Sequence, residues 1–146
     1  MTRTIIQRKI NAPIEKVFRT VADVEQFSKA IPHILKVEFL TENKTGIGAC
    51  FRETRKMKDK AITTQLEVTE YIENDHVRMV ASDHGITWDT VFSVRRENGQ
   101  TVLNMTMDAT TNNFFKNIML YIIKSMVQKS IEQDMDSVKT FCELQK

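Results

Sequence analysis

The chain has 146 residues, of which 41% are hydrophobic and 27% are charged, and its net charge is +2. This length suits one domain over residues 1–146 that buries roughly two-thirds of its unfolded surface. The small net charge argues against nucleic acid as a partner, since nucleic-acid-binding proteins concentrate far more basic charge. No apolar run approaches the ~18 residues of a transmembrane segment, and the N-terminus lacks the apolar core of a signal peptide.

Residues that commonly hold metals, cofactors or disulfides are few and scattered. Cys50 and Cys142 both lie in apolar patterns and form neither a disulfide framework nor a metal-binding spacing. The histidines, His33, His76 and His84, are dispersed and build no metal motif. The four glycines are too few for a phosphate-binding loop. We therefore expect no metal and no cofactor, and a protein of the reducing cytoplasm.

The first forty residues predict a strand, two short helices and a second strand. The alternating segment Thr2–Ile10 predicts the first strand, which Asn11-Ala12-Pro13 ends while starting a helix. Asp23 is suited to cap a second helix that Pro32 ends, and residues 35–40 predict another strand. The apolar positions with helical spacing are Ile14, Val17, Phe18, Val21, Val24, Phe27 and Ile31.

From residue 49 onwards the chain predicts antiparallel hairpins whose turns fix the pairing of the strands. Asn98-Gly99 lies between alternating segments and is a strong signal for a type I′ hairpin. With a two-residue loop there, one face of the hairpin is apolar and the other is polar. The pairs on the apolar face are Val94 with Leu103, Phe92 with Met105, Thr90 with Met107, and Trp88 with Ala109.

Three further two-residue loops extend this apolar face across the sheet. They are His84-Gly85, Asn74-Asp75 and Lys58-Asp59. This registration places Val68 opposite Ala81, and we expect a β-bulge at Tyr71–Ile72. The other residues that it turns inward are Ala49, Phe51, Glu53, Arg55, Ile62, Thr64, Leu66, Val77 and Met79.

The segment from Asn112 to about Gln145 contains no glycine or proline and predicts one long helix. Residues 114–127 are apolar on most sides, whereas the second half carries a narrow stripe at the 3–4 spacing of an amphipathic helix. We expect the narrow half to pack tightly as structure and the broad half to bound a cavity. Leu120 and Ile123 would then face the short helices or another molecule. The narrow stripe consists of Ile131, Met135, Val138 and Cys142.

The order β-α-α-β6-α predicts an α+β fold, a seven-stranded antiparallel sheet wrapped around the long C-terminal helix. Four motifs along the chain resemble the SRPBCC (START-like) superfamily, which has the helix-grip fold of birch-pollen-type allergens, and its polyketide cyclase/dehydrase-like branch in particular. Many relatives have two glycines where this chain has Lys58-Asp59-Lys60, which leaves the register of Glu53 open. The motifs are INAPIEKVF (10–18), DVEQF (23–27) followed by Ile31-Pro32, GIGACFRE (46–53) and LEVTEY (66–71).

The resemblance implies a cavity between sheet and helix, and the inward face supplies its candidate walls. Glu53 and Arg55 stand out because buried charges must pair, become neutral or meet a ligand. Glu53 is also the one candidate for a catalytic acid or base, and the alternative is that it lies near the cavity mouth, solvated or paired with an arginine. The candidate ligand-binding residues are Phe51, Glu53, Arg55, Thr64, Leu66, Met79, Trp88, Thr90, Phe92, Met105, Met107, Phe114, Phe115, Ile118, Met119 and Ile122.

Three functions are compatible with these features. The favoured one is binding of a small apolar or amphipathic ligand, such as a lipid, isoprenoid, quinone or polyketide. The second is a cyclase, dehydratase or hydrolase that uses acid–base catalysis in the same cavity. The third is an interaction protein or homodimer that uses the apolar helix surface. A basic run predicts a solvated hairpin tip, with contact to an anionic lipid or a partner as the alternative. It consists of Arg52, Arg55, Lys56, Lys58 and Lys60.

Overall fold

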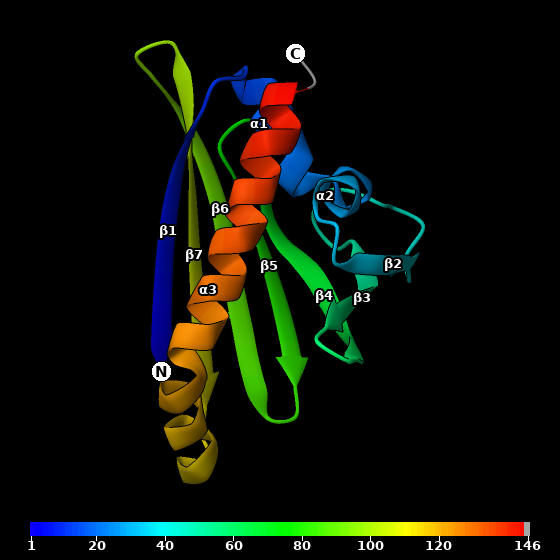
Figure 1. The fold of residues 1–146 in the computed structure, drawn as a ribbon. Coiled ribbons are helices and arrows are strands. Elements are labelled where there is room, and N and C mark those ends of the chain that lie inside the picture. The colour runs from blue at the N-terminus through cyan, green and yellow to red at the C-terminus, as the bar shows by residue number, and fades with distance from the viewer. Residues whose placement is uncertain (145–146) are drawn as a thin grey trace.

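A computed structural model describes residues 1–144 and shows a sheet crossed by one long helix (Figure 1). The seven strands form a single antiparallel sheet in the order β1-β7-β6-β5-β4-β3-β2. The predicted α+β fold and its element order are therefore confirmed. The elements are β1 (Thr2–Ile10), α1 (Ile14–Ala22), α2 (Val24–Ala30), β2 (Ile34–Phe39), β3 (Cys50–Met57), β4 (Lys60–Ile72), β5 (His76–Asp83), β6 (Ile86–Glu97), β7 (Gln100–Thr111) and α3 (Phe114–Leu144).

The two short helices form where the sequence predicts them. Pro13 precedes α1 in an extended conformation, and the apolar side of α1 is buried. The Asp23 side chain accepts a hydrogen bond of 3.0 Å from the backbone N–H of Glu25 at the start of α2, which satisfies a donor that the helix leaves free. Figure 1 shows α1 and α2 beside the C-terminal half of α3. The predicted helix end at Gln145 lies outside the described residues.

The predicted strand registers hold in three of the four hairpins. β6 pairs with β7, β5 with β6, and β3 with β4 as the two-residue loops require. Asn98 and Gly99 have φ of 50° and 79°, as a type I′ turn demands. Lys58 adopts φ of 57° in place of a glycine, and this turn keeps Glu53 on the inner face of the sheet.

The β4–β5 hairpin differs from its prediction. Val68 pairs with Met79 instead of Ala81, because three residues, 73–75, separate the two strands and a bulge lies between Val68 and Glu70. The bulge thus occurs before Tyr71–Ile72, not at that position. The two irregularities move the register by two residues in total, so Val68 still points inward. Val68 is 1% exposed, in agreement with this parity.

One side of helix α3 packs on the sheet along the length of the helix. This side carries the narrow stripe in the second half and Leu120 in the first half. Leu120 is 1% exposed and forms a small cluster with Ile86 and Ala109, against which Ile123 also packs. The prediction that Leu120 and Ile123 face the short helices or another molecule is therefore wrong. A helix segment that is apolar on most sides does not reveal by amphipathicity which side packs. Among the helices of residues 1–144, none has the length and apolar character required to cross a bilayer.

Candidate functional site

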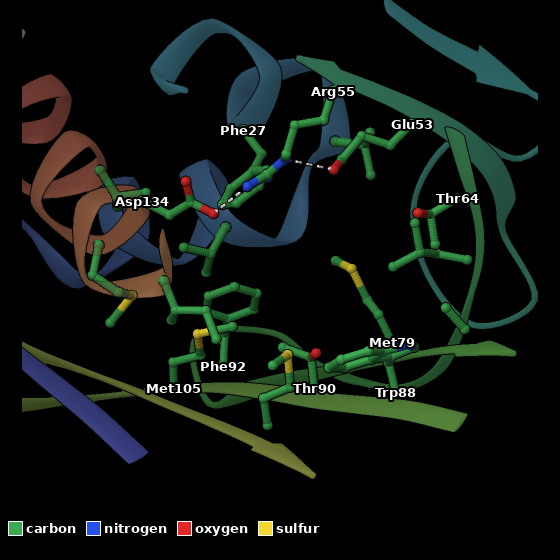
Figure 2. Close-up of a pocket in the computed structure, with 18 of the residues that line it drawn as sticks. Phe27, Glu53, Arg55, Thr64, Met79, Trp88, Thr90, Phe92, Met105 and Asp134 are labelled. Atoms are coloured by element: carbon green, nitrogen blue, oxygen red, sulfur yellow. Dashed lines mark hydrogen bonds and ion pairs between the residues drawn. The ribbon is translucent and has the colours of Figure 1, made fainter. Parts of the chain in front are cut away.

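A cavity of about 200 Å³ lies between the inner face of the sheet, the two short helices and the second half of α3 (Figure 2). All eleven sheet residues predicted as cavity walls line it. Its surface is almost entirely apolar apart from one group of charged side chains and two threonines. The eleven residues are Phe51, Glu53, Arg55, Thr64, Leu66, Met79, Trp88, Thr90, Phe92, Met105 and Met107.

The helix residues predicted to bound the cavity do not reach it. Their side chains point outward from the first half of α3, so this part of the prediction is wrong. The opposite side of the same turns, which carries Leu120, packs on the sheet and directs these residues to solvent. Ile62, predicted on the inner face, is 42% exposed and also lies outside the cavity lining. The misassigned helix residues are Phe114, Phe115, Ile118, Met119 and Ile122.

The helical wall comes instead from the narrow stripe that the sequence assigned to structure alone. Asp134 belongs to this wall and was missed, although it lies three residues after Ile131 and four before Val138. A carboxylate on an otherwise apolar helical stripe was the available signal. The lining residues that the sequence reasoning did not propose are Val21, Val24, Phe27, Ala81, Ile131, Asp134, Met135 and Val138.

Glu53, Arg55 and Asp134 form a charged trio at one end of the cavity. Alternation along β3 places Glu53 and Arg55 on the same face, and α3 brings Asp134 toward them. Arg55 donates from Nε to Glu53 Oε1 at 3.2 Å and from Nη1 to Asp134 Oδ2 at 2.7 Å. The three side chains are only 14–18% exposed. Figure 2 shows the guanidinium between the two carboxylates.

The trio contains two acids but only one base, and this imbalance sets its electrostatics. Burial raises the pKa of Glu53, and Arg55 opposes the rise while the charge of Asp134 adds to it. Burial likewise raises the pKa of Asp134, against the opposing effect of Arg55. The charged form of a carboxyl is disfavoured in a poorly solvated site, and a second nearby anion disfavours it further. One end of the cavity therefore holds a carboxyl group that retains its proton to higher pH than an exposed one.

The raised pKa predicts how Glu53→Gln changes stability with pH. The folded state holds the Glu53 proton above the ordinary pKa of 4.5, so the contribution of Glu53 to stability falls as pH rises through that region. The free energy of unfolding of Glu53→Gln should therefore rise relative to that of the unmodified chain as pH increases. Urea denaturation across mildly acidic to neutral pH measures this difference.

Glu70→Gln supplies a control of opposite sign. Hydrogen bonds from Arg78 and His76 lower the pKa of Glu70, so its stabilising contribution is present above the ordinary pKa and is lost as pH falls. Relative to the unmodified chain, Glu70→Gln should lose stability as pH rises. If the free energies of unfolding of both variants, relative to the unmodified chain, change with pH in the same direction, Glu53 is not the carboxyl with the raised pKa.

A second, shallower groove borders the trio on the outside. It runs between the β3–β4 hairpin and α3, and Arg55 lines both this groove and the cavity. Within residues 1–144, no group of three or more His, Cys, Asp or Glu side chains is placed to hold a metal ion. The groove residues are His33, Arg55, Lys56, Met57, Lys58, Met126, Lys129, Ser130 and Gln133.

An antiparallel sheet that holds a long C-terminal helix over an internal cavity defines the helix-grip class. Over residues 1–143 the chain matches the family described as polyketide cyclase / dehydrase and lipid transport, and it belongs to that family. This confirms the SRPBCC relationship that the four sequence motifs indicate. Comparison with curated proteins found no significant match.

Solved structures with the same fold share little sequence with this chain. TTHA0849 from Thermus thermophilus has a TM-score of 0.79 and 15% identity over 97% of both chains. Ara h 8.0201 has a TM-score of 0.74 and 14% identity, also over 97% of both. StfQ, the di-domain ARO/CYC of the steffimycin biosynthetic pathway, has a TM-score of 0.80 and 12% identity over 97% of this chain and 50% of that one. These likenesses establish the fold.

Proposed function

We propose that the chain acts as a single domain that binds one small, mostly apolar ligand in the cavity. The observation that carries the proposal is an apolar cavity with its charged groups gathered at one end. Binding sites for small molecules are typically apolar with a few convergent polar groups that fix orientation. In this chain Glu53, Arg55 and Asp134 would hold the polar end of the ligand, and the sheet would bury the rest.

The size and lining of the cavity narrow the class of ligand. About 200 Å³ is small beside the roughly 300–1,000 Å³ of common ligand pockets, so a compact ligand is favoured over a long lipid. Flexible methionine side chains would let the cavity adapt to a somewhat larger molecule. Two carboxylates around one guanidinium favour a polar end that donates hydrogen bonds, such as a hydroxyl or amino group. The lining methionines are Met79, Met105, Met107 and Met135.

Trp88 provides a test, because it is the single tryptophan of the chain and it lines the cavity. We expect 1-aminoanthracene, a compact aromatic amine, to bind and to accept excitation energy from Trp88. Anthracene-1-carboxylate should bind at least tenfold more weakly, since it would bring a third anion to a trio with one guanidinium. Absence of energy transfer from Trp88 at saturating aminoanthracene would contradict the proposal, as would tighter binding of the carboxylate.

A second candidate function is acid–base catalysis in the same cavity, of a cyclase, dehydratase or hydrolase type. The pKa of Glu53, raised by burial, favours it, because a carboxyl group that keeps its proton to higher pH than an exposed one is better suited to act as a general acid. Under this function Glu53→Gln would abolish turnover of a substrate while leaving affinity for 1-aminoanthracene within a few-fold. Under binding alone, Glu53→Gln would change only affinity.

We also propose that the protein acts in the cytoplasm. The thiol of Cys50 is half-buried and that of Cys142 is buried, and both are free, which suits a reducing compartment. Burial raises the pKa of Cys142, so this thiol resists the ionisation that oxidation requires.

A further inference from the structure

The first half of α3 presents a continuous apolar surface to solvent. Residues four apart along this segment lie on one side of the helix, where Phe114, Ile118, Ile122 and Met126 form one row and Phe115 and Met119 another. Phe114, Phe115 and Ile122 are 73–78% exposed. We call these six residues the outer stripe. Contiguous apolar surfaces of this kind mark sites of interaction with proteins or membranes.

The outer stripe lies opposite the side of α3 that packs on the sheet. Leu120 and Ile123 occupy the packed side, so the segment is apolar on two faces and the sheet covers one of them. Figure 1 shows these first turns of α3 extending beyond the start of β1, away from the two short helices. Burial in the fold therefore does not explain why the outer stripe is apolar.

The charges around the outer stripe are mainly cationic. Between Asp108 and Glu132 the charged residues are Lys116, Lys124 and Lys129, without a single acid. The tip of the β3–β4 hairpin adds Lys56, Lys58 and Lys60 against Asp59, and the shallow groove joins this tip to α3 through Met126 and Lys129. Asp83 is the last residue of β5 and precedes His84, whose carbonyl accepts a hydrogen bond from Lys116. The net charge of the region is positive.

We propose that the outer stripe docks on the surface of an anionic phospholipid bilayer. A helix with an exposed apolar side and flanking lysines is the pattern that lies in a membrane interface, with its cations at anionic headgroups. A second copy of this chain is a poorer occupant, because a symmetric contact would bring two copies of this positively charged region into one interface. The hydrophobic side chains would enter the acyl boundary, while Lys124, Lys129 and the hairpin lysines meet the headgroups.

Docking in this orientation would bring the groove beside the cavity to the bilayer. Arg55 lines both the cavity and the groove, and the groove is also lined by Met126 of the outer stripe and by Lys129. An apolar ligand could then pass between bilayer and cavity without crossing bulk water. This second step rests on the proposed ligand binding, whereas docking does not.

Co-sedimentation with vesicles tests the docking. The full chain should bind vesicles of phosphatidylcholine mixed with phosphatidylglycerol about tenfold or more tightly than vesicles of phosphatidylcholine alone, since each lysine at an anionic surface contributes roughly a fivefold change in affinity. Phe115→Gln combined with Ile122→Gln should weaken binding at least tenfold, as should Lys124→Gln combined with Lys129→Gln.

Matched controls use exposed residues elsewhere on the molecule. Ile5→Gln with Ile72→Gln removes apolar side chains that are 60% and 57% exposed, and Lys9→Gln with Lys44→Gln removes two cations. Both control variants should bind vesicles as the unmodified chain does. Equal losses in control and test variants, or no binding to anionic vesicles, would overturn the proposal. So would a dimer in sedimentation equilibrium that Phe115→Gln with Ile122→Gln dissociates.

Energy transfer from Trp88 to 1-aminoanthracene, measured without vesicles, separates this proposal from ligand binding. The outer-stripe variants should retain it, because Phe115 and Ile122 do not line the cavity. Vesicle binding without energy transfer would sustain the docking and reject the ligand. Energy transfer without vesicle binding would support the ligand site and reject the docking.

Discussion

Replacing Arg55 by methionine is expected to lower the free energy of unfolding at neutral pH by about 3 kcal/mol. The substitution removes the guanidinium that lies between Glu53 and Asp134 and leaves two largely buried carboxylates next to each other. Loss of one partner from a buried charge group is costly because the remaining charges are neither solvated nor compensated. Urea denaturation at neutral pH measures the change.

A triple variant distinguishes two causes of this loss of stability, the uncompensated carboxylate charges and the lost packing of the Arg55 side chain. Adding Glu53→Gln and Asp134→Asn to Arg55→Met removes both uncompensated charges, so the triple variant should regain most of the lost stability. Acidification should also narrow the difference between Arg55→Met and the unmodified chain, because both carboxyl groups then bind protons. If the triple variant is as unstable as Arg55→Met alone, the guanidinium acts through its packing and the electrostatic account of the trio is wrong.

Filling the cavity should remove ligand binding. Ala81 is 2% exposed, lines the cavity and faces Trp88 across the β5–β6 pair. Ala81→Leu adds three carbon atoms at this point, and we expect its affinity for 1-aminoanthracene to fall at least tenfold. Overpacking should cost about 1–3 kcal/mol of stability. Titration monitored by energy transfer from Trp88 measures the affinity.

Two further variants, a matched control and a second test of the cavity, complete this experiment. Ala61→Leu makes the same chemical change at an exposed position of β4, and it should bind the probe normally. Thr90→Leu occludes the cavity from β6 and should also weaken binding, which covers the case in which Ala81→Leu does not fold. Unchanged affinity in Ala81→Leu and Thr90→Leu would show that the probe binds elsewhere.

Most of the sheet could be predicted because turns and alternation are local signals. Asn98-Gly99 and Lys58-Asp59 fix their strand pairs, and a period of two then assigns each inward side chain. All eleven predicted sheet walls line the cavity for this reason. The β4–β5 pair was misregistered because a bulge leaves no distinct local pattern, yet its inward residues were correct since the shift was even.

The prediction for the first half of α3 was wrong for a different physical reason. Residues 114–127 are apolar on both sides, so burial alone could not select between the side of Leu120 and the side of Ile122. Extending the spacing of Ile131 and Met135 backwards by threes and fours leads to Val127, Ile123 and Leu120, and would have selected the packed side. Asp134 was missed because a single carboxylate on a helix resembles a solvated residue until its distance to Arg55 is known.

The position of the ligand can be measured most directly through the methionines, of which the chain has eight. Met79, Met105, Met107 and Met135 line the cavity, whereas Met57, Met119 and Met126 are 36–51% exposed on the hairpin and on α3. In a chain labelled with ¹³C at the methionine methyls, one equivalent of 1-aminoanthracene should shift the NMR signals of the four cavity methionines and leave those of Met57, Met119 and Met126 in place. Shifts confined to Met57, Met119 and Met126 would instead put the probe on the outer surface and contradict a ligand site inside the fold.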